Sequence, residues 1–281
     1  MYMGFNVGFI GLGTMGLPMS RNVLRGGYRV YGYDINPLRM EEFRRFGGTV
    51  CRSIGELVGR CDCIHIVVLD DGQVREVMLG DDGVVKNAVK PLYVAIHSTI
   101  LPSTCIEVAG KASRFGVKVI DAPISGGPIG AEEGSLTFMV GGDREAFEKL
   151  KPILELMGKN IFYLGALGSG LKVKLLNNLM LYCNNVIAAE AVEIARKMGI
   201  SESDFINVVN TSSGGSWVTQ KWESFNLLKW IDSKPGFVEL ILKDIEDGVK
   251  TIYEHGLRSI IFEFFKGYYE YRKFLRDKKV R

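Results

Sequence analysis

Short apolar runs alternate with helix-like stretches over the first 165 residues of the chain. In the helix-like stretches apolar residues recur every three or four positions, as at 37–46, 102–115 and 143–158. Nearly continuous apolar strands that alternate with helices predict parallel strands covered by helices on both faces. The runs that predict strands are residues 6–10, 28–34, 63–69, 92–97, 117–122, 136–142 and 161–165.

After Gly165 no further strand is predicted. Residues 168–199 have the pattern of one helix of about 30 residues, roughly 45 Å long, and it is apolar on nearly all sides after Leu175. Such a helix is buried on most sides, which suits the centre of an all-α domain and also contact with a second copy. We therefore predict an α/β domain over 1–165 and an all-helical domain over 166–281. Its further helices are expected at 202–210, 216–230, 237–254 and 257–275.

Composition and charge exclude several classes of protein. The 281 residues are 47% hydrophobic and 24% charged with a net charge of +3, which is ordinary for a globular enzyme or binding protein. The basic cluster at 271–281 has the pattern of a solvated chain end rather than a nucleic-acid site. Apolar runs such as 63–69 are far shorter than the ~20 residues that span a bilayer. A signal peptide begins with basic residues, whereas no basic residue precedes Arg21 here. We expect neither nucleic acid nor a membrane as a partner.

The cysteines and histidines are few and scattered. Five cysteines form no C-x-x-C pair, and the three histidines lie far apart in the sequence. This pattern indicates neither a disulfide framework nor a metal site. A reducing cytoplasm is the expected location.

The first glycine cluster has the pattern of a dinucleotide-binding loop. Gly11, Gly13 and Gly16 form G-x-G-x-x-G between a predicted strand and a predicted helix, and Asp34 ends the next predicted strand. The three glycines permit a tight turn, a close approach to a pyrophosphate, and packing of the helix. The amides of the helix N-terminus then face the phosphates, and the carboxylate accepts hydrogen bonds from the ribose. The alternative, a glycine-rich turn without a ligand, does not explain the ordered context. The sequence therefore predicts a Rossmann-type doubly wound sheet.

Asp34 also bears on the choice of cofactor. A carboxylate at this position repels the 2′-phosphate of NADP, and Ile35 offers no charge that would bind it. Arg39 is close enough in sequence to blur the distinction. NAD is the expected cofactor, and NADP stays an alternative.

A second glycine cluster follows the predicted strand that ends at Ala122. Bare amides at Gly126 and Gly127, together with the hydroxyl of Ser125, suit a carboxylate or a developing alkoxide. A plain turn before a helix is the competing interpretation.

Four segments in order resemble the motifs of one enzyme family. They are "FIGLGTMGLPMSRN" (9–22), "DAPISGGPIGAEEGSLTFMVGG" (121–142), "GSGLKVKLLNN" (168–178) and "LILKD" (240–244). The chain is similar to the β-hydroxyacid dehydrogenase family, which includes 3-hydroxyisobutyrate dehydrogenase, tartronate semialdehyde reductase and shorter relatives of phosphogluconate dehydrogenase. The resemblance extends from residue 5 to about residue 250 and implies hydride transfer between NAD(P) and a small hydroxy acid.

The resemblance assigns roles to individual residues. It implies that Lys174 is the catalytic lysine, with Asn178 four residues further along the same helix face. It implies that Ser125, Gly126 and Gly127 hold the substrate. Ser98 and Thr99 match a loop that lies along the cofactor, and Lys243 matches a residue near the nicotinamide. The cofactor-binding residues are then expected to be Gly11, Leu12, Gly13, Thr14, Met15, Gly16, Asp34, Leu69, Thr99 and Lys243.

A lysine at this position makes chemical sense. Oxidation of an alcohol requires removal of the hydroxyl proton as hydride leaves, and a lysine amine does this when its pKa falls from about 10.4 toward roughly 7–8. Burial in an apolar helix lowers that pKa, and we expect Lys243 to supply a like charge. Asn178 can bond the substrate but cannot act as a base. The alternative for Lys174 is an ordinary surface lysine near a helix start.

Several positions depart from the family pattern or leave it open. His97 and the pair Asp70 and Asp71 stand where relatives often carry other residues, and we interpret His97 as an ordinary strand-end histidine. Only about 31 residues follow Lys250, so contacts from a longer tail are expected to be absent. Trp217 either closes the substrate pocket or is a core tryptophan of a loop.

The leading hypothesis is an NAD-dependent dehydrogenase of a small 3-hydroxy acid, of the 3-hydroxyisobutyrate or L-serine type. One alternative is an NADPH-dependent reductase of glyoxylate or semialdehydes. Another is a dinucleotide sensor without turnover, against which the set Ser125, Lys174 and Asn178 argues. The apolar long helix predicts a homodimer or homotetramer.

Overall fold

The fold is described from a computed structural model, over residues 5–224, 231 and 236–279. Contacts between backbone positions divide the chain into two compact units, Met1–Lys174 and Leu175–Arg281. The predicted boundary after residue 165 stays a prediction: residues 166–174, with the start of the long helix, group with the first unit. Each unit is described by itself.

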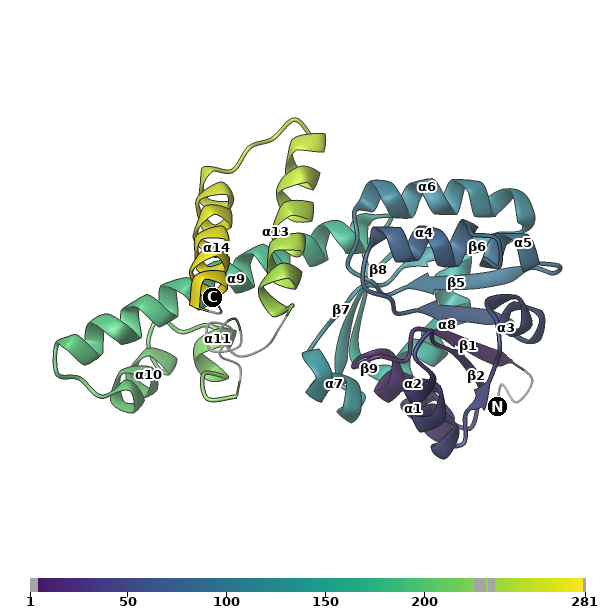
Figure 1. The fold of residues 1–281 in the computed structure, drawn as a ribbon, viewed down its shortest axis with the longest axis horizontal. Coiled ribbons are helices and arrows are strands. Elements are labelled where there is room, and N and C mark those ends of the chain that lie inside the picture. The colour runs from purple at the N-terminus through teal and green to yellow at the C-terminus, as the bar shows by residue number, and fades with distance from the viewer. Residues whose placement is uncertain (1–4, 225–230, 232–235, 280–281) are drawn as a thin grey trace. The chain divides into compact units, whose positions relative to one another are not determined.

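The first unit is built on one sheet. Over the described residues its nine strands follow the order β3-β2-β1-β4-β5-β6-β8-β7, with β9 beside β8 (Figure 1). The strands are β1 (Asn6–Ile10), β2 (Arg29–Tyr33), β3 (Thr49–Val50), β4 (Cys63–Ile66), β5 (Leu92–Ile96), β6 (Val117–Asp121), β7 (Ile124–Ser125), β8 (Leu136–Gly142) and β9 (Gly158–Tyr163). The six strands from β3 to β6 pair in parallel, and the strand order reverses between β1 and β4. In doubly wound sheets this reversal opens a crevice at the carboxyl ends of the strands.

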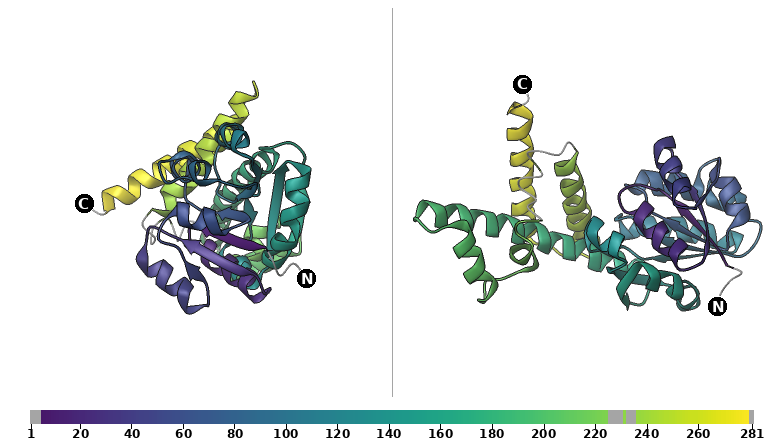
Figure 2. Two further views of the ribbon diagram at one scale, coloured as in Figure 1. Left: turned by 90° about the vertical axis from the view of Figure 1, so that its right-hand side faces the viewer. Right: turned by 90° about the horizontal axis from the view of Figure 1, so that it is seen from below.

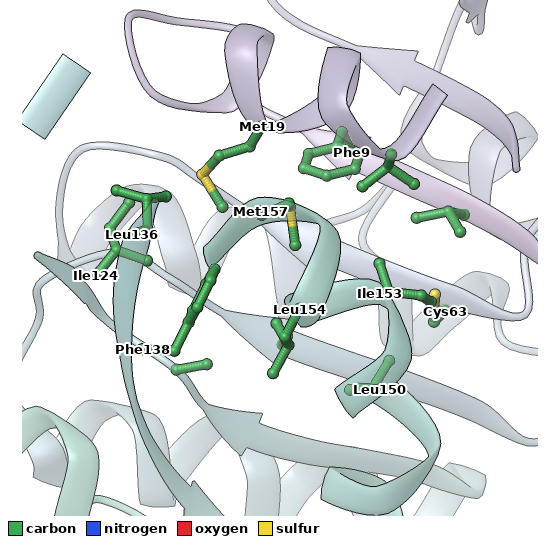
Figure 3. Close-up of a cluster of buried hydrophobic side chains, with 14 of the residues drawn as sticks. Phe9, Met19, Cys63, Ile124, Leu136, Phe138, Leu150, Ile153, Leu154 and Met157 are labelled. Atoms are coloured by element: carbon green, nitrogen blue, oxygen red, sulfur yellow. The ribbon is translucent and has the colours of Figure 1, made fainter. Parts of the chain in front are cut away.

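Helices cover both faces of this sheet (Figures 1 and 2). The helices of the first unit are α1 (Gly16–Arg25), α2 (Pro37–Arg45), α3 (Ile54–Arg60), α4 (Asp71–Leu79), α5 (Val84–Asn87), α6 (Pro102–Ala112), the 3₁₀ turn η1 (Ser113–Phe115), α7 (Gly127–Glu133) and α8 (Arg144–Met157). Alternate residues of β1 point to opposite sides: Val7 and Phe9 join a cluster with α1 and α8, whereas Ile10 joins one with α3, α4 and α6. Figure 3 shows Met19, Phe138 and Leu154 in the first of these clusters.

The predicted α/β architecture is confirmed, but the expectation of parallel strands throughout is wrong. β8 runs antiparallel to β6 and to β7. The chain returns through the single short helix α7 and then pairs beside the strand it has just left. The sequence analysis also missed β3 and β7, because each has only two residues and so shows no periodicity.

The second unit is helical and is arranged around α9 (Ser169–Lys197), whose first residues belong to the first unit. The other helices are α10 (Glu202–Asn210), α11 (Trp217–Gln220), α13 (Phe237–Glu254) and α14 (Ile260–Lys279). One apolar cluster joins α9 to α13 and α14, and another joins α9 to α10 and α11. The predicted helix 216–230 is shorter in the structure, since α11 ends at Gln220, and its residues 225–230 lie outside the described residues. No described helix combines the length and apolar character needed to cross a membrane.

Candidate active site

The carboxyl ends of five parallel strands bring most of the predicted site residues to one edge of the first unit. The glycine loop follows β1, Asp34 follows β2, Leu69 lies after β4, Thr99 after β5, and Ser125 after β6. Backbone hydrogen bonds join these segments: Val67 N–H donates to the Ile10 carbonyl and Ala122 N–H to the Ile96 carbonyl. Residues that are far apart in sequence therefore lie along one edge of the sheet, on both sides of the point where the strand order reverses.

The three motif glycines differ in what a side chain would meet. Gly11 has a φ of +93°, and a Cβ there would lie 2.3 Å from the carbonyl oxygen of Val67. At Gly16 a Cβ would lie 2.0 Å from the carbonyl oxygen of Gly11. Around Gly13, by contrast, no described atom lies within 4 Å of an added Cβ. Packing within the protein therefore accounts for two of these glycines, while Gly13 borders open space.

The N-terminus of α1 suits an anion. No side-chain hydrogen bond caps this helix at Met15, and its first turn has no acidic residue. In the same unit, α2, α3, α4 and α8 are each capped by a side chain, whereas α5, α6 and α7, like α1, are not. The first amides of a helix carry partial positive charge and need acceptors. The residues of this turn thus fit the pyrophosphate of a dinucleotide, which would lie against Gly13 and the start of α1.

Asp34 is tied to the glycine loop. Its Oδ2 accepts a hydrogen bond from Leu12 N–H at 2.7 Å, and its Oδ1 accepts one from Asn36 N–H at 2.7 Å. Each carboxylate oxygen can accept a second bond, so the ribose hydroxyls still find acceptors here. Arg39 pairs with Glu42 at 3.0 Å, which directs its charge to the neighbouring turn of α2.

The loops after β4 and β5 hold one another. Ser98 Oγ accepts a hydrogen bond from Val68 N–H at 3.0 Å, and Asp71 Oδ1 accepts one from Leu101 N–H at 3.1 Å. Asp70 caps α4 by accepting from Gln73 N–H. The two aspartates that depart from the family pattern thus have structural partners.

His97 is buried and bonded to His65 and to the Ala122 carbonyl, which agrees with its interpretation as a strand-end histidine.

The second glycine cluster forms a sharp turn. Ser125 is the last residue of β7 and is half-buried, Gly126 has a φ of +126°, and Gly127, with a φ of +62°, begins α7. A side chain at Gly127 would meet no described atom within 4 Å. Two positive φ angles in succession require glycine, so the backbone directly after Ser125 makes a turn that other residues would strain.

Lys174 lies in the second turn of α9, and the start of this helix is bonded to the end of β6. Asp121 accepts hydrogen bonds from Gly168 N–H at 2.7 Å and Leu171 N–H at 2.8 Å. Lys174 is half-buried, and Asn178, one turn further on, is buried. The lysine therefore belongs to the same unit as the glycine loop and Ser125.

In the second unit Asn178 belongs to a buried network that the sequence analysis missed. Its Nδ2 donates to Asp244 Oδ2 at 2.7 Å, and the hydroxyl of Tyr182 donates to the same oxygen at 2.9 Å. Burial and Asp244 hold the pKa of Tyr182 well above its usual value, so its hydroxyl stays a donor. Tyr182 was detectable in principle, since it continues the spacing of four residues from Lys174 through Asn178.

Lys243, which we expected to supply a like charge to Lys174, is paired with two carboxylates. Its Nζ lies 3.2 Å from Asp244 Oδ1 and 3.1 Å from Asp247 Oδ2. Burial lowers the pKa of this lysine, but the two carboxylates outweigh burial and leave it raised.

Trp217 is half-exposed at the start of α11, and the core tryptophan of this region is Trp222. No described group of three or more His, Cys, Asp or Glu residues could hold a metal ion.

Comparisons with known proteins decide the family. Residues 6–165 match the NAD binding domain of 6-phosphogluconate dehydrogenase, and residues 168–273 match the family described as NAD-binding of NADP-dependent 3-hydroxyisobutyrate dehydrogenase. The chain belongs to the β-hydroxyacid dehydrogenase family. It is 35% identical over 226 residues to 2-(hydroxymethyl)glutarate dehydrogenase of Eubacterium barkeri, covering 80% of this chain and 75% of that protein.

Other members of the family are similarly close. The NAD-dependent L-serine dehydrogenase of Pseudomonas aeruginosa is 34% identical over 245 residues, covering 85% of this chain and 82% of that protein. The structure of 3-hydroxyisobutyrate dehydrogenase from Mycobacterium tuberculosis, solved with L-serine, superposes with a TM-score of 0.83 at 30% identity, covering 95% and 93% of the two chains. This β-hydroxyacid dehydrogenase is therefore an NAD(P)-dependent oxidoreductase that transfers hydride to or from a small hydroxy acid.

Proposed function

We propose that this enzyme oxidises a small 3-hydroxy acid, of the 3-hydroxyisobutyrate or L-serine type, with Lys174 as general acid and base. The observation that carries the proposal is the bonding of the first turn of α9 to the end of β6. It places Lys174 on the unit whose sheet edge also bears the glycine loop and Ser125. The relatives named for hydroxymethylglutarate, L-serine and hydroxyisobutyrate support a substrate with a hydroxyl beside a carboxylate.

Each polar group has a distinct part in this reaction. The amides at Gly126 and Gly127 and the Ser125 hydroxyl donate hydrogen bonds to the substrate carboxylate. Lys174 takes the proton from the substrate hydroxyl in oxidation and returns it in reduction. Asn178 orients the substrate, since an amide is not a base. The bound nicotinamide accepts the hydride.

We further propose NAD rather than NADP as the preferred cofactor, held by the residues Gly11, Leu12, Gly13, Thr14, Met15, Gly16, Asp34, Leu69, Thr99 and Lys243. Both oxygens of Asp34 are fixed by backbone amides, so the carboxylate cannot turn away from a 2′-phosphate. Arg39, the cation we considered for that phosphate, already has Glu42 as its partner. These two observations support NAD.

A panel assay tests the proposal. Purified enzyme with NAD and 3-hydroxyisobutyrate, L-serine, 3-hydroxypropionate or glycerate should produce NADH with at least one acid, and Lys174→Ala should lower kcat by about 10²–10⁴-fold. Lys172→Ala is the matched control, because Lys172 lies two residues away on the same helix and faces elsewhere. Equal losses in the two variants would refute the assignment of Lys174. Binding of NAD without turnover of any acid, in either direction, would favour a sensor.

We also propose that residues 1–165 serve as the NAD(P)-binding domain and residues 166–281 as a substrate and dimerisation domain. Support for a homodimer or homotetramer comes from exposed apolar side chains along one face of α9 and just beyond it, at Leu176, Met180, Ile187, Ile194 and Met198. A second copy would cover this face. Light scattering should report a dimer or larger, and Met180→Lys should shift it toward the monomer, whereas Lys172→Ala should not.

A cytoplasmic location is part of the same proposal. All five cysteines are buried and free, as expected in a reducing compartment.

Trp217, half-exposed at the start of α11, is proposed to close the substrate pocket.

A further inference from the structure

Asp121 is a fully buried carboxylate to which the proposed reaction assigns no part. It is the last residue of β6 and has 0% of its surface exposed. Buried carboxylates need several hydrogen-bond donors. Here Oδ1 accepts from Gly168 N–H at 2.7 Å and Oδ2 from Leu171 N–H at 2.8 Å. Both oxygens thus bind backbone amides at the start of α9.

Two motif glycines form the space that holds this carboxylate. A Cβ on Gly141 would lie 2.6 Å from Asp121 Oδ1, and a Cβ on Gly170 would lie 2.8 Å from Oδ2 and 2.0 Å from the Met139 carbonyl oxygen. Contacts below 3.0 Å do not occur for real Cβ atoms, so neither position accepts alanine without a shift. Gly141 of "MVGG" and Gly170 of "GSG" are therefore explained by Asp121 and by the close approach of α9 to β8.

The bonding pattern is that of the ionised carboxylate. Burial raises the pKa of Asp121, while the amides of Gly168, Leu171 and Gly170 lower it again in part. Amide hydrogen bonds to both oxygens stabilise the charged form of the carboxylate relative to the neutral acid. The negative charge also lies at the positive end of the α9 dipole, where it is stabilising.

We propose that Asp121 is a positioning residue for Lys174: it fixes the first turn of α9 against the end of β6 and so sets where the catalytic amine lies. The inference rests on the proposed function. Lys174 follows Leu171 by three residues, about 4.5 Å along the helix axis, so a tilt of the first turn moves the lysine directly. Four residues after Asp121 the same chain segment supplies Ser125. One carboxylate therefore ties the lysine helix to the segment that carries the substrate-binding turn.

Asp121→Asn tests the inference, because an amide can offer only one acceptor and turns an NH₂ donor toward the other amide. Asp143→Asn is the matched control. Asp143 caps α8 in the same unit by accepting from Ala146 N–H at 2.8 Å, which asparagine can keep, and its other partner is Lys118, at 3.8 Å in an exposed ion pair. Neither α8 nor Lys118 carries a proposed site role. Both variants are assayed for kcat, for KM of the hydroxy acid, for NAD affinity by calorimetry, and for amide hydrogen exchange over residues 166–176.

We expect Asp121→Asn to lower kcat by roughly 10- to 100-fold, with NAD affinity within about twofold of wild type and faster exchange at Gly168 and Leu171. Asp143→Asn should match wild type in all four measurements. A role in folding alone would lower the fraction of protein that binds NAD but leave kcat per binding site unchanged.

Full kcat in Asp121→Asn, or equal losses in the two variants, would overturn the inference. If Asp121→Asn does not fold, leucic acid at position 171 replaces it, since this hydroxy-acid analogue of leucine removes one N–H and keeps the side chain. The same loss of kcat is then expected. An inactive wild type would refute the proposed function, whereas an active wild type with a fully active variant refutes only the positioning role.

Discussion

His65 and His97 form a buried pair in the sheet of the first unit, and their geometry predicts how stability depends on pH. His65 Nδ1 lies 2.8 Å from His97 Nε2, and His97 Nδ1 lies 2.7 Å from the Ala122 carbonyl oxygen. A carbonyl only accepts, so His97 Nδ1 carries the proton, and Nε2 accepts from His65. Phe9 stacks on His65, and Phe138 packs edge-on to His97. The Cys63 thiol lies 4.0 Å from His65 Nε2, and its own pKa is raised by burial.

The size of the effect follows from the pKa of His97. Burial lowers it from 6.5 to about 4, and burial also lowers that of His65. Between these two pH values the unfolded chain binds more protons than the folded chain, so the free energy of unfolding falls as the pH falls. For His97 alone the loss is about 2 kcal/mol between pH 7 and pH 5, and about 3 kcal/mol in full by pH 4.

The variant His97→Gln removes this titration. At neutral pH it should destabilise the protein by about 1–3 kcal/mol, because His65 or the Ala122 carbonyl loses its partner. Between pH 7 and pH 5 it should then lose about 2 kcal/mol less stability than wild type. His255→Gln is the control, since His255 is exposed on the other unit. Urea unfolding followed by circular dichroism at constant ionic strength measures all three proteins, and parallel pH curves for wild type and His97→Gln would show the reasoning to be wrong.

Three further predictions concern the cofactor loop and the helical unit. Gly13→Ala should leave the melting temperature unchanged but weaken NAD binding by at least about tenfold, whereas Gly16→Ala should lower the melting temperature because its Cβ has no room. Asp34→Ser should raise kcat/KM for NADP relative to NAD by about tenfold or more, and an unchanged ratio would remove Asp34 from cofactor choice. Asp244→Leu should destabilise the protein by about 1–3 kcal/mol, since two buried donors lose their acceptor; thermal melts measure this, and an unchanged midpoint would contradict it.

The parts of the fold that follow from local pattern were predicted well. Strands such as β1 and β6 are largely apolar and bounded by glycine or polar residues, so the local pattern identifies them. The direction of β8 relative to β6 was predicted wrongly, as parallel. It depends on pairing between Ile120 and Gly142, which is set by tertiary contacts and leaves no periodic signal. The strands β3 and β7 have two residues each and are defined only by their pairing with β2 and β8, so no local pattern marks them.

The residues of the candidate site also fall into those that local sequence pattern predicts and those that depend on tertiary contacts. The glycine loop and Asp34 are adjacent in space because two parallel strands bring them together. The sequence motif G-x-G-x-x-G followed by an acidic residue is typical of that arrangement, so it could be predicted. Asp121 and Asp244 bond to residues 47 and 66 positions away, and nothing in the local sequence marks such partners. The ion pairs of Lys243 were not predicted for a related reason: Asp244 and Asp247 were visible in the sequence, but which carboxylates reach an ammonium depends on side-chain geometry.

The glycines offer a criterion that separates structural from ligand-facing positions. Glycines are required where a Cβ would strike protein atoms, as at Gly11, Gly16 and Gly170. Gly13 and Gly127 belong to the same two motifs, yet a Cβ at either would meet no described atom within 4 Å. Backbone φ explains Gly127 but not Gly13, which has no positive φ. Because no packing contact with the described residues and no backbone φ requires glycine at position 13, close approach of a ligand is the remaining reason. The Gly13→Ala variant adds only the Cβ methyl group, so a loss of NAD affinity without a loss of stability would assign this glycine to ligand binding.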